Sequence, residues 1–251
     1  MGTPALPPMA YGRSFDFGAI EEALASLPDL ELLGLMPHSS NYTFLVRLGP
    51  DPDLLAIYKP AAGERPLWDF PPGTLFRREV AAYALAKSLG WPCVPPTVVR
   101  AQAPHGIGSL QMFVDGDWDP DQLAHGHDQR AWLEFAVFDV IANNADRKAG
   151  HCLTDSEGVI WAIDHGLTFH AQTKLRTVIW KFAGRHLPAP MRDDLARVAA
   201  DLDGGELAVT LSDLTDPDEV DALRRRVDQA LDRKWLLPHP ESDWSIPWPP
   251  I

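Results

Sequence analysis

Asp146 lies in the polar stretch of residues 144–151, two residues before Lys148 and five before His151. A carboxylate can orient or deprotonate a hydroxyl group, and a nearby lysine can neutralise charge on a phosphoryl group. We therefore predict Asp146, Lys148 and the neighbouring Asn144 as catalytic residues, with His151 as a metal ligand. The alternative is an ordinary polar loop in which Asp and Asn side chains only cap and turn the chain.

Asp164 follows the apolar run of residues 159–163 and precedes His165 and Gly166. This is the position of the Asp-Phe-Gly triplet in kinases, where the carboxylate holds a metal ion against the phosphates. An Asp at the start of a turn is common, but one that follows the Asp146 stretch by a single hairpin is much less common. We predict Asp164 as a ligand of Mg²⁺ or Mn²⁺. Because imidazole suits the softer Mn²⁺ better than Mg²⁺, His151 either favours Mn²⁺ or leaves a second metal unbound.

Lys59 ends an apolar run at residues 54–59, from which a lysine can reach the α- and β-phosphates of ATP. Glu79, on a predicted helix at residues 77–89, is its predicted ion-pair partner. The alternatives are a lysine whose stem lies along a sheet edge and a solvated helix glutamate.

Two further stretches are predicted to contact ATP. The turn at residues 38–41 contains hydroxyl groups and backbone N–H groups that can bind phosphate oxygens, although it has no Gly and its residue types are standard in turns. The backbone of the apolar run at residues 111–116 is predicted to pair with adenine. The predicted contacts are Ser39, Ser40, Asn41, Met112 and Val114.

The elements that must position these residues follow from apolar periodicity. Helical spacing predicts helices at residues 17–27, 77–89, 129–142 and 216–235. Strands are predicted at 30–35, 42–48, 54–59, 97–100, 109–114, 151–154 and 159–163. The predicted class is α+β, a two-lobed atypical protein- or lipid-kinase-like fold. Its predicted parts are a lead-in and helix (1–28), an N-lobe of antiparallel sheet plus helix (29–116), a mainly helical C-lobe (117–237) and an extended Pro- and Trp-rich tail (238–251), with a hinge at 117–121.

Composition excludes several classes of protein. The formal net charge of −13 disfavours binding to nucleic acid or to anionic lipid. The two cysteines, Cys93 and Cys152, have no zinc-like spacing and indicate a reducing compartment. We find no secretion signal and no apolar run long enough to span a bilayer. We therefore expect a cytoplasmic protein with no nucleic-acid partner and no membrane insertion.

Together these stretches resemble the phosphatidylinositol 3-/4-kinase-like group, and the chain looks most like a family of actinobacterial proteins within it. The likeness to type II phosphatidylinositol 4-kinases lies in residues 39–44, 56–60, 109–116, 144–147 and 162–167. The resemblance implies ATP as cofactor, Lys59 on the phosphates, Asp146 as the catalytic carboxylate and Asp164 on the metal. Two departures are His151, where the group has Asn, and the Gly-poor phosphate turn.

The predicted function is transfer of the ATP γ-phosphate to a hydroxyl of a small molecule or a protein. The alternatives are an ATP-binding pseudokinase and nucleotidyl transfer to a protein. A basic stretch after Asp164 either receives an anionic acceptor or is the solvated face of a helix. It contains Lys174, Arg176, Lys181 and Arg185, with Trp180 and Phe182 between them.

Overall fold

The computed structural model describes residues 16–37, 39–51, 54–91, 94–125, 129–232, 235 and 237–250. His38, Cys93, the predicted lead-in up to residue 15 and Ile251 of the predicted tail lie outside these ranges. The chain forms two compact units, Met1–Phe76 with Pro95–Val114 and Arg77–Val94 with Asp115–Ile251. The division falls inside helix α2 (Leu75–Leu89) and puts most of it into the second unit, whereas the prediction placed this helix in the N-lobe.

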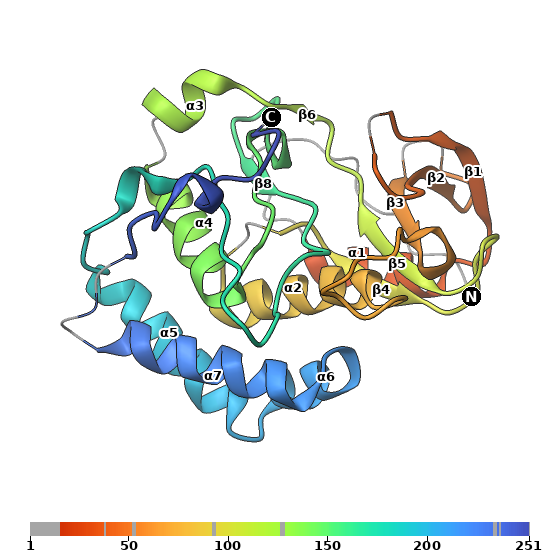
Figure 1. The fold of residues 1–251 in the computed structure, drawn as a ribbon. Coiled ribbons are helices and arrows are strands. Elements are labelled where there is room, and N and C mark those ends of the chain that lie inside the picture. The colour runs from red at the N-terminus through yellow and green to blue at the C-terminus, as the bar shows by residue number, and fades with distance from the viewer. Residues whose placement is uncertain are drawn as a thin grey trace. The chain divides into compact units, whose positions relative to one another are not determined.

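The first unit contains an antiparallel five-stranded sheet in the order β1-β2-β3-β5-β4, beside helix α1 (Figure 1). Helix α1 ends against Arg100 of β4, whose guanidinium donates to the carbonyl oxygens of Leu24, Ala25 and Leu27. A cation at this end satisfies carbonyls that have no partner within the helix. The elements are α1 (Phe17–Ser26), β1 (Leu30–Leu35), β2 (Phe44–Leu48), β3 (Leu55–Pro60), β4 (Thr97–Arg100) and β5 (Gly108–Met112).

Strand β3 alternates strictly between buried and half-buried residues. Ala56 and Tyr58 face the core, and the Tyr58 hydroxyl donates to the Gly106 carbonyl at 2.5 Å. Because successive side chains of a strand point to opposite faces, Lys59 lies on the face away from Tyr58. The predicted strand at residues 54–59 is confirmed as β3.

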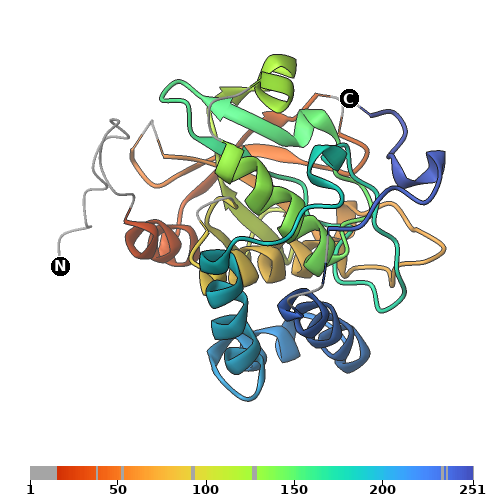
Figure 2. The same cartoon turned by 90° about the vertical axis from the view of Figure 1, so that its left-hand side faces the viewer.

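The second unit has a helical core that includes α2, α4 and a group formed by α5, α6 and α7. Figure 2 shows α5 and α7 side by side. Among the described helices, none combines the length and the apolar character needed to cross a bilayer. The bounds are α3 (Pro120–His125), α4 (Gln129–Ala142), α5 (Ala189–Leu202), α6 (Glu206–Leu214) and α7 (Pro217–Leu231).

The second unit also contains a three-stranded sheet, β6-β7-β8, in which β6 precedes α4 in the chain and β7 and β8 follow it. The predicted hairpin is confirmed as β7 (Cys152–Asp155) and β8 (Ile160–Ala162), and the Asp155 carboxylate accepts N–H bonds inside its turn. Residues 117–121, the predicted hinge, include the end of β6 (Gly116–Asp117) and the start of α3, and their role as a hinge stays a prediction. Gly116 permits this pairing, because a Cβ there would lie 2.8 Å from the Thr154 carbonyl oxygen.

Gly108 allows β5 to approach β3 beside Lys59, because a Cβ at Gly108 would lie 2.3 Å from the Lys59 carbonyl oxygen. We expect Gly108→Ala to lower the free energy of unfolding by about 1–3 kcal/mol, the usual cost of overpacking. Urea denaturation measures it. Gly34→Ala in β1 is the matched control, since a Cβ there meets nothing within 4 Å. Equal effects of the two substitutions would contradict the steric explanation.

Candidate active site

The loop of residues 143–151, which we call the catalytic loop, joins α4 to β7 in the second unit. It brings Asp146 and Lys148 together, with the Lys148 Nζ atom 3.1 Å from Asp146 Oδ2. Their side chains are 27% and 21% exposed, so both remain accessible to a substrate. A partly exposed carboxylate beside an ammonium group can receive a hydroxyl group and neutralise an arriving phosphoryl group.

Burial and nearby charged groups shift the pKa of the Asp146 carboxyl. Burial raises the pKa of its carboxyl, and the charge of Asp164 acts in the same direction. The ion pair with Lys148 lowers this pKa, but burial is the largest influence. A raised pKa makes the carboxylate a better proton acceptor.

The ring of His151 spans the two acidic residues. Its Nδ1 atom lies 3.0 Å from the Asp146 carbonyl oxygen, and its Nε2 atom lies 3.4 Å from Asp164 Oδ2. A carbonyl oxygen can only accept, so Nδ1 carries a proton in this contact. The Lys148 N–H is 3.5 Å from the same nitrogen, which is too long to compete.

A metal ion fits this arrangement. With the proton on Nδ1, a neutral His151 presents a lone pair on Nε2 toward the Asp164 carboxylate. Two such acceptors 3.4 Å apart repel each other unless a proton or a metal cation lies between them. Metal-bound histidines commonly donate their other N–H to a carbonyl, as His151 does to Asp146.

The protein supplies few ligands at this position. Among the described residues, no group of three or more His, Cys, Asp or Glu side chains is placed to hold a metal ion. A metal held by Asp164 and His151 would take its remaining ligands from phosphate and water, which is usual for Mg²⁺ at nucleotide sites.

Asp164 has a left-handed backbone with φ of 59°, and its side chain is 52% exposed. This conformation is uncommon outside glycine and is retained only where surrounding contacts fix it. The neighbours of Asp164 provide those contacts. Arg147 donates to the Ile163 carbonyl at 2.8 Å and lies 2.5 Å from the His165 ring nitrogen Nε2.

Arg147 and Asp139 form an ion pair in which both side chains are 0% exposed. Arg147 Nε lies 3.1 Å from Asp139 Oδ1, and Asn144 and Thr177 also donate to the Asp139 carboxylate. Burial raises the pKa of Asp139, while Arg147 and these two donors act in the opposite direction. The pair ties α4 to the catalytic loop and to both sides of Asp164.

Helix α2 holds the turn after Asp164 through two consecutive residues. Glu79 accepts the His165 N–H at 2.9 Å, and Arg78 donates to the Thr168 carbonyl at 2.6 Å. Arg78 is itself paired with Glu219 of α7 at 2.7 Å. Glu79 is only 2% exposed, so the alternative of a solvated glutamate is wrong. Its pairing with Lys59 stays a prediction.

Two asparagines shape the catalytic loop from inside. Asn144 is 0% exposed, donates to Asp139 and accepts the Asp146 N–H at 3.0 Å. These contacts give the predicted catalytic residue Asn144 a positioning role. Asn143, with φ of 53°, donates to the carbonyl oxygens of His170 and Gln172.

The predicted phosphate turn of the first unit is organised by its own side chains. The Ser39 hydroxyl donates to the Asn41 carbonyl at 2.8 Å, and Asn41 Oδ1 accepts the Arg65 N–H at 2.9 Å. Ser40 is exposed, and Lys59 is half-buried opposite Ser109 of β5. The predicted phosphate contacts of these residues stay predictions.

The predicted adenine contacts lie at the end of β5. The Met112 N–H donates to the Pro96 carbonyl at 2.8 Å, and the Phe113 N–H donates to Leu55 at 3.2 Å. Both donors are therefore engaged within the sheet. Backbone carbonyl oxygens of this segment, or the backbone of Val114, would therefore have to make any contact with adenine.

The basic stretch is not a helix beyond one short 3₁₀ turn, η3 (Trp180–Phe182), so the alternative of a basic helix face is wrong. Lys181 donates to the Leu123 carbonyl and lies over the Phe182 ring at 5.1 Å. Burial and, secondarily, Arg185 lower the pKa of Lys181. Arg176 is exposed, and its backbone bonds to the catalytic loop at Asn144 and Arg147.

Sequence reasoning missed the buried network that supports the site. The available signal was a charged residue, Asp139, in the apolar run of α4, because a buried charge requires a partner. The missed residues are Arg78, Asp139, Asn143, Arg147, His165 and Glu219.

No family model matches the chain. Protein Rv2133c of Mycobacterium tuberculosis is 38% identical to it over 268 residues, which cover 91% of this chain and 95% of that protein.

Solved structures share the fold. The Golgi casein kinase aligns with a TM-score of 0.59 at 15% identity over 88% of this chain and 75% of that chain. The same kinase with Mn/ADP bound aligns with a TM-score of 0.56 at 14% identity, over 87% of this chain and 76% of that chain. Hydra Fam20 with sugar aligns with a TM-score of 0.51 at 14% identity, over 84% of this chain and 86% of that chain. These likenesses confirm a kinase-like α+β fold, while the finer likeness to phosphatidylinositol kinases stays a prediction.

The Asp139–Arg147 pair generates a stability prediction. Asp139→Asn would leave the Arg147 charge buried without its counter-charge, so we expect a loss of about 3–5 kcal/mol in the free energy of unfolding. Urea denaturation measures the loss. Asp221→Asn, which breaks the exposed pair with Arg224 on α7, is the control and should cost about 1 kcal/mol or less. A comparable small loss for Asp139→Asn would show that the buried pair does not support the loop.

The raised pKa of Asp146 generates a pH prediction. Above its folded-state pKa, the ionised Asp146 is less favourable in the folded protein than in the unfolded chain, so it lowers stability. This penalty fades as the pH falls toward the ordinary value of 3.8. Asp146→Asn should therefore raise the free energy of unfolding at pH 7 and lose that advantage near pH 4. A pH series of urea denaturation tests this, and a variant less stable than the parent at pH 7 would contradict it.

Proposed function

Because the chain belongs to the family of Protein Rv2133c from Mycobacterium tuberculosis and has a kinase-like fold, we propose that it transfers the γ-phosphate of ATP to a hydroxyl group. One observation carries the proposal. The His151 ring bridges the backbone of Asp146 and the carboxylate of Asp164, which joins the predicted catalytic carboxylate to the predicted metal ligand. Transfer of a phosphoryl group needs two carboxylates close together, one to orient the acceptor hydroxyl and one to bind the metal.

Asp146 orients the acceptor hydroxyl and accepts its proton. Burial favours this role, because the raised pKa brings the carboxyl closer to the pH at which a general base works best. Lys148, 3.1 Å from Asp146, keeps the carboxylate ionised and faces the same accessible region. Its ammonium group neutralises charge on the phosphoryl group as transfer proceeds.

Asp164 and His151 hold Mg²⁺ or Mn²⁺. When bound, the metal supplies positive charge for the ATP phosphates. The nitrogen ligand favours Mn²⁺, and the related Golgi casein kinase structure has Mn/ADP bound. Glu79 and Arg147 fix the backbone on either side of Asp164, so that its carboxylate is held in position before nucleotide arrives.

In the first unit, Lys59 binds the α- and β-phosphates, and the turn at Ser39, Ser40 and Asn41 contacts phosphate oxygens. Carbonyl groups near Met112 and the backbone of Val114 pair with adenine. These roles rest on the motif resemblance to phosphatidylinositol 3-/4-kinases and on the strand position of Lys59.

The acceptor is a hydroxyl of a small molecule or a protein, and an anionic acceptor suits the site. Arg176 is the basic residue that supports this choice, because it is exposed and its backbone is bonded to the catalytic loop. Lys181 and Arg185 are instead packed on the Phe182 ring. The hydra Fam20 structure contains a sugar, so sugars and their phosphates are the first acceptors to screen.

Incubation with γ-labelled or α-labelled ATP, in Mg²⁺ or Mn²⁺, tests the proposal. We expect transfer or release of the γ label only. Asp146→Ala should lower turnover by about 10²–10⁴-fold and retain nucleotide binding, because it removes the general base. Asp164→Ala should abolish metal-dependent nucleotide binding, measured by calorimetry with ATP.

Asp221→Ala on α7 is the control and should match the parent protein. Incorporation of the α label would favour nucleotidyl transfer over phosphoryl transfer. Nucleotide binding with neither transfer nor hydrolysis would favour the pseudokinase alternative. Full turnover by the Asp146 variant would remove the catalytic assignment of that residue.

A further inference from the structure

The segment Leu237–Pro250, which we call the C-terminal strap, follows α7 in the second unit. Sequence composition predicted an extended tail, and the described part is largely irregular with one 3₁₀ turn, η4 (Asp243–Ser245). Backbone hydrogen bonds attach the strap to the rest of the unit at its root, its middle and its tip. These attachments involve the basic stretch and the catalytic loop.

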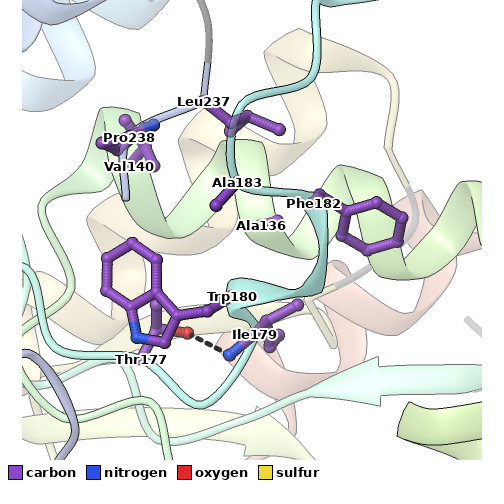
Figure 3. A pocket seen from close by; sticks show the side chains of 9 residues that line it. All are labelled: Ala136, Val140, Thr177, Ile179, Trp180, Phe182, Ala183, Leu237 and Pro238. Carbon is purple, nitrogen blue, oxygen red and sulfur yellow. Dashed lines mark hydrogen bonds between the residues drawn. The ribbon is translucent and has the colours of Figure 1, made fainter. Parts of the chain in front are cut away.

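The root of the strap pairs with the basic stretch. Leu237 accepts the Gly184 N–H at 2.9 Å and donates its own N–H to the Arg185 carbonyl at 3.0 Å. The Leu237 side chain is 3% exposed. With Pro238 it lines a small pocket together with side chains of α4 and of residues 177–183 (Figure 3). The strap therefore begins on a packed base.

The middle of the strap bonds to the same stretch closer to the catalytic loop. The Ser245 carbonyl oxygen accepts the Thr177 N–H at 3.0 Å and the Trp180 indole N–H at 3.3 Å. The Thr177 hydroxyl in turn donates to the buried Asp139 carboxylate at 3.0 Å. The backbone N–H of Val178 donates to Arg147 at 3.1 Å. One side of the catalytic loop is thus linked to the strap through this stretch.

The tip of the strap bonds directly to the catalytic loop. The Pro250 carbonyl oxygen accepts the Ala149 N–H at 2.9 Å. Ala149 is 7% exposed and lies between Lys148 and His151, the two residues proposed to meet the phosphates and the metal. A nearly buried N–H that loses its acceptor is unfavourable, so this bond restrains the backbone between Lys148 and His151.

We propose that the C-terminal strap positions Lys148 and His151 for catalysis, through the bond from Ala149 to Pro250. This inference rests on the proposed function. Pro250 acts through the loop backbone and is a positioning residue. Its loss should misplace Lys148 and His151 while leaving the Asp139–Arg147 support intact. Small displacements of reacting groups reduce turnover more than they reduce substrate binding.

Two variants remove the same hydrogen bond from opposite sides. A chain ending at Trp248 lacks the acceptor, and Ala149→Pro lacks the donor. Proline is compatible with this position because Ala149 is the first residue of a 3₁₀ helix, η2 (Ala149–His151), and Lys148 before it is extended, with ψ of 162°. A chain ending at Pro250 keeps the acceptor and is the matched control.

We expect each of the two variants to lower kcat for ATP turnover by about 10- to 100-fold with KM for ATP nearly unchanged. Combining them should give no further loss, because both remove one interaction. Hydrogen–deuterium exchange should show faster exchange of residues 147–152 in both variants, with melting temperatures confirming that they fold. The control ending at Pro250 should match the full chain in each measurement.

The outcomes separate the two proposals. Unchanged kcat and unchanged exchange in the chain ending at Trp248 would overturn the role of the strap, and so would additive losses in the combined variant. If the full chain itself neither transfers nor hydrolyses the γ-phosphate, the proposed function fails. The exchange of residues 147–152 then still decides whether the strap restrains the loop.

Discussion

The ion pair between Arg147 and Asp139 is the interaction on which the rest of the site depends. Both side chains are fully buried, so neither charge can be solvated if the other is lost. The other donors of Arg147 bond to the Ile163 carbonyl oxygen, before Asp164, and contact the His165 ring, after it. A single guanidinium thus fixes the catalytic loop, α4 and the turn that carries the proposed metal ligand. The pair contributes less through net stability than through this fixed geometry.

Charged residues on the buried face of α2 also fix the backbone near Asp164. Arg78 and Glu79 are both 2% exposed, and both bond to backbone groups of the turn after Asp164. A left-handed aspartate is strained, and strain persists only where neighbouring contacts determine the backbone. The second unit therefore maintains an unfavourable conformation at Asp164 by means of two ion-paired or hydrogen-bonded helix residues.

Sequence patterns predicted the elements and the chemical groups, but not what supports them. Asp146 and Asp164 could be proposed as site residues from the sequence because each lies beside a strongly periodic helix or strand. The pairing of Asp139 with Arg147 could not be predicted, because contacts between buried charges depend on tertiary packing. The strap was predicted only as extended, since its attachments use backbone carbonyls such as that of Pro250, which every residue type possesses. The two-residue strand β6 was too short to produce any periodic signal.

Cys152 follows His151 directly and is 2% exposed at the start of β7. Burial raises the pKa of its thiol to about 12, so almost no reactive thiolate is present at neutral pH. An alkylating reagent can attack this sulfur only when the surrounding chain opens. The rate at which Cys152 is labelled in the native protein therefore reports how often the chain around the catalytic loop opens. No cysteine needs to be introduced for this measurement.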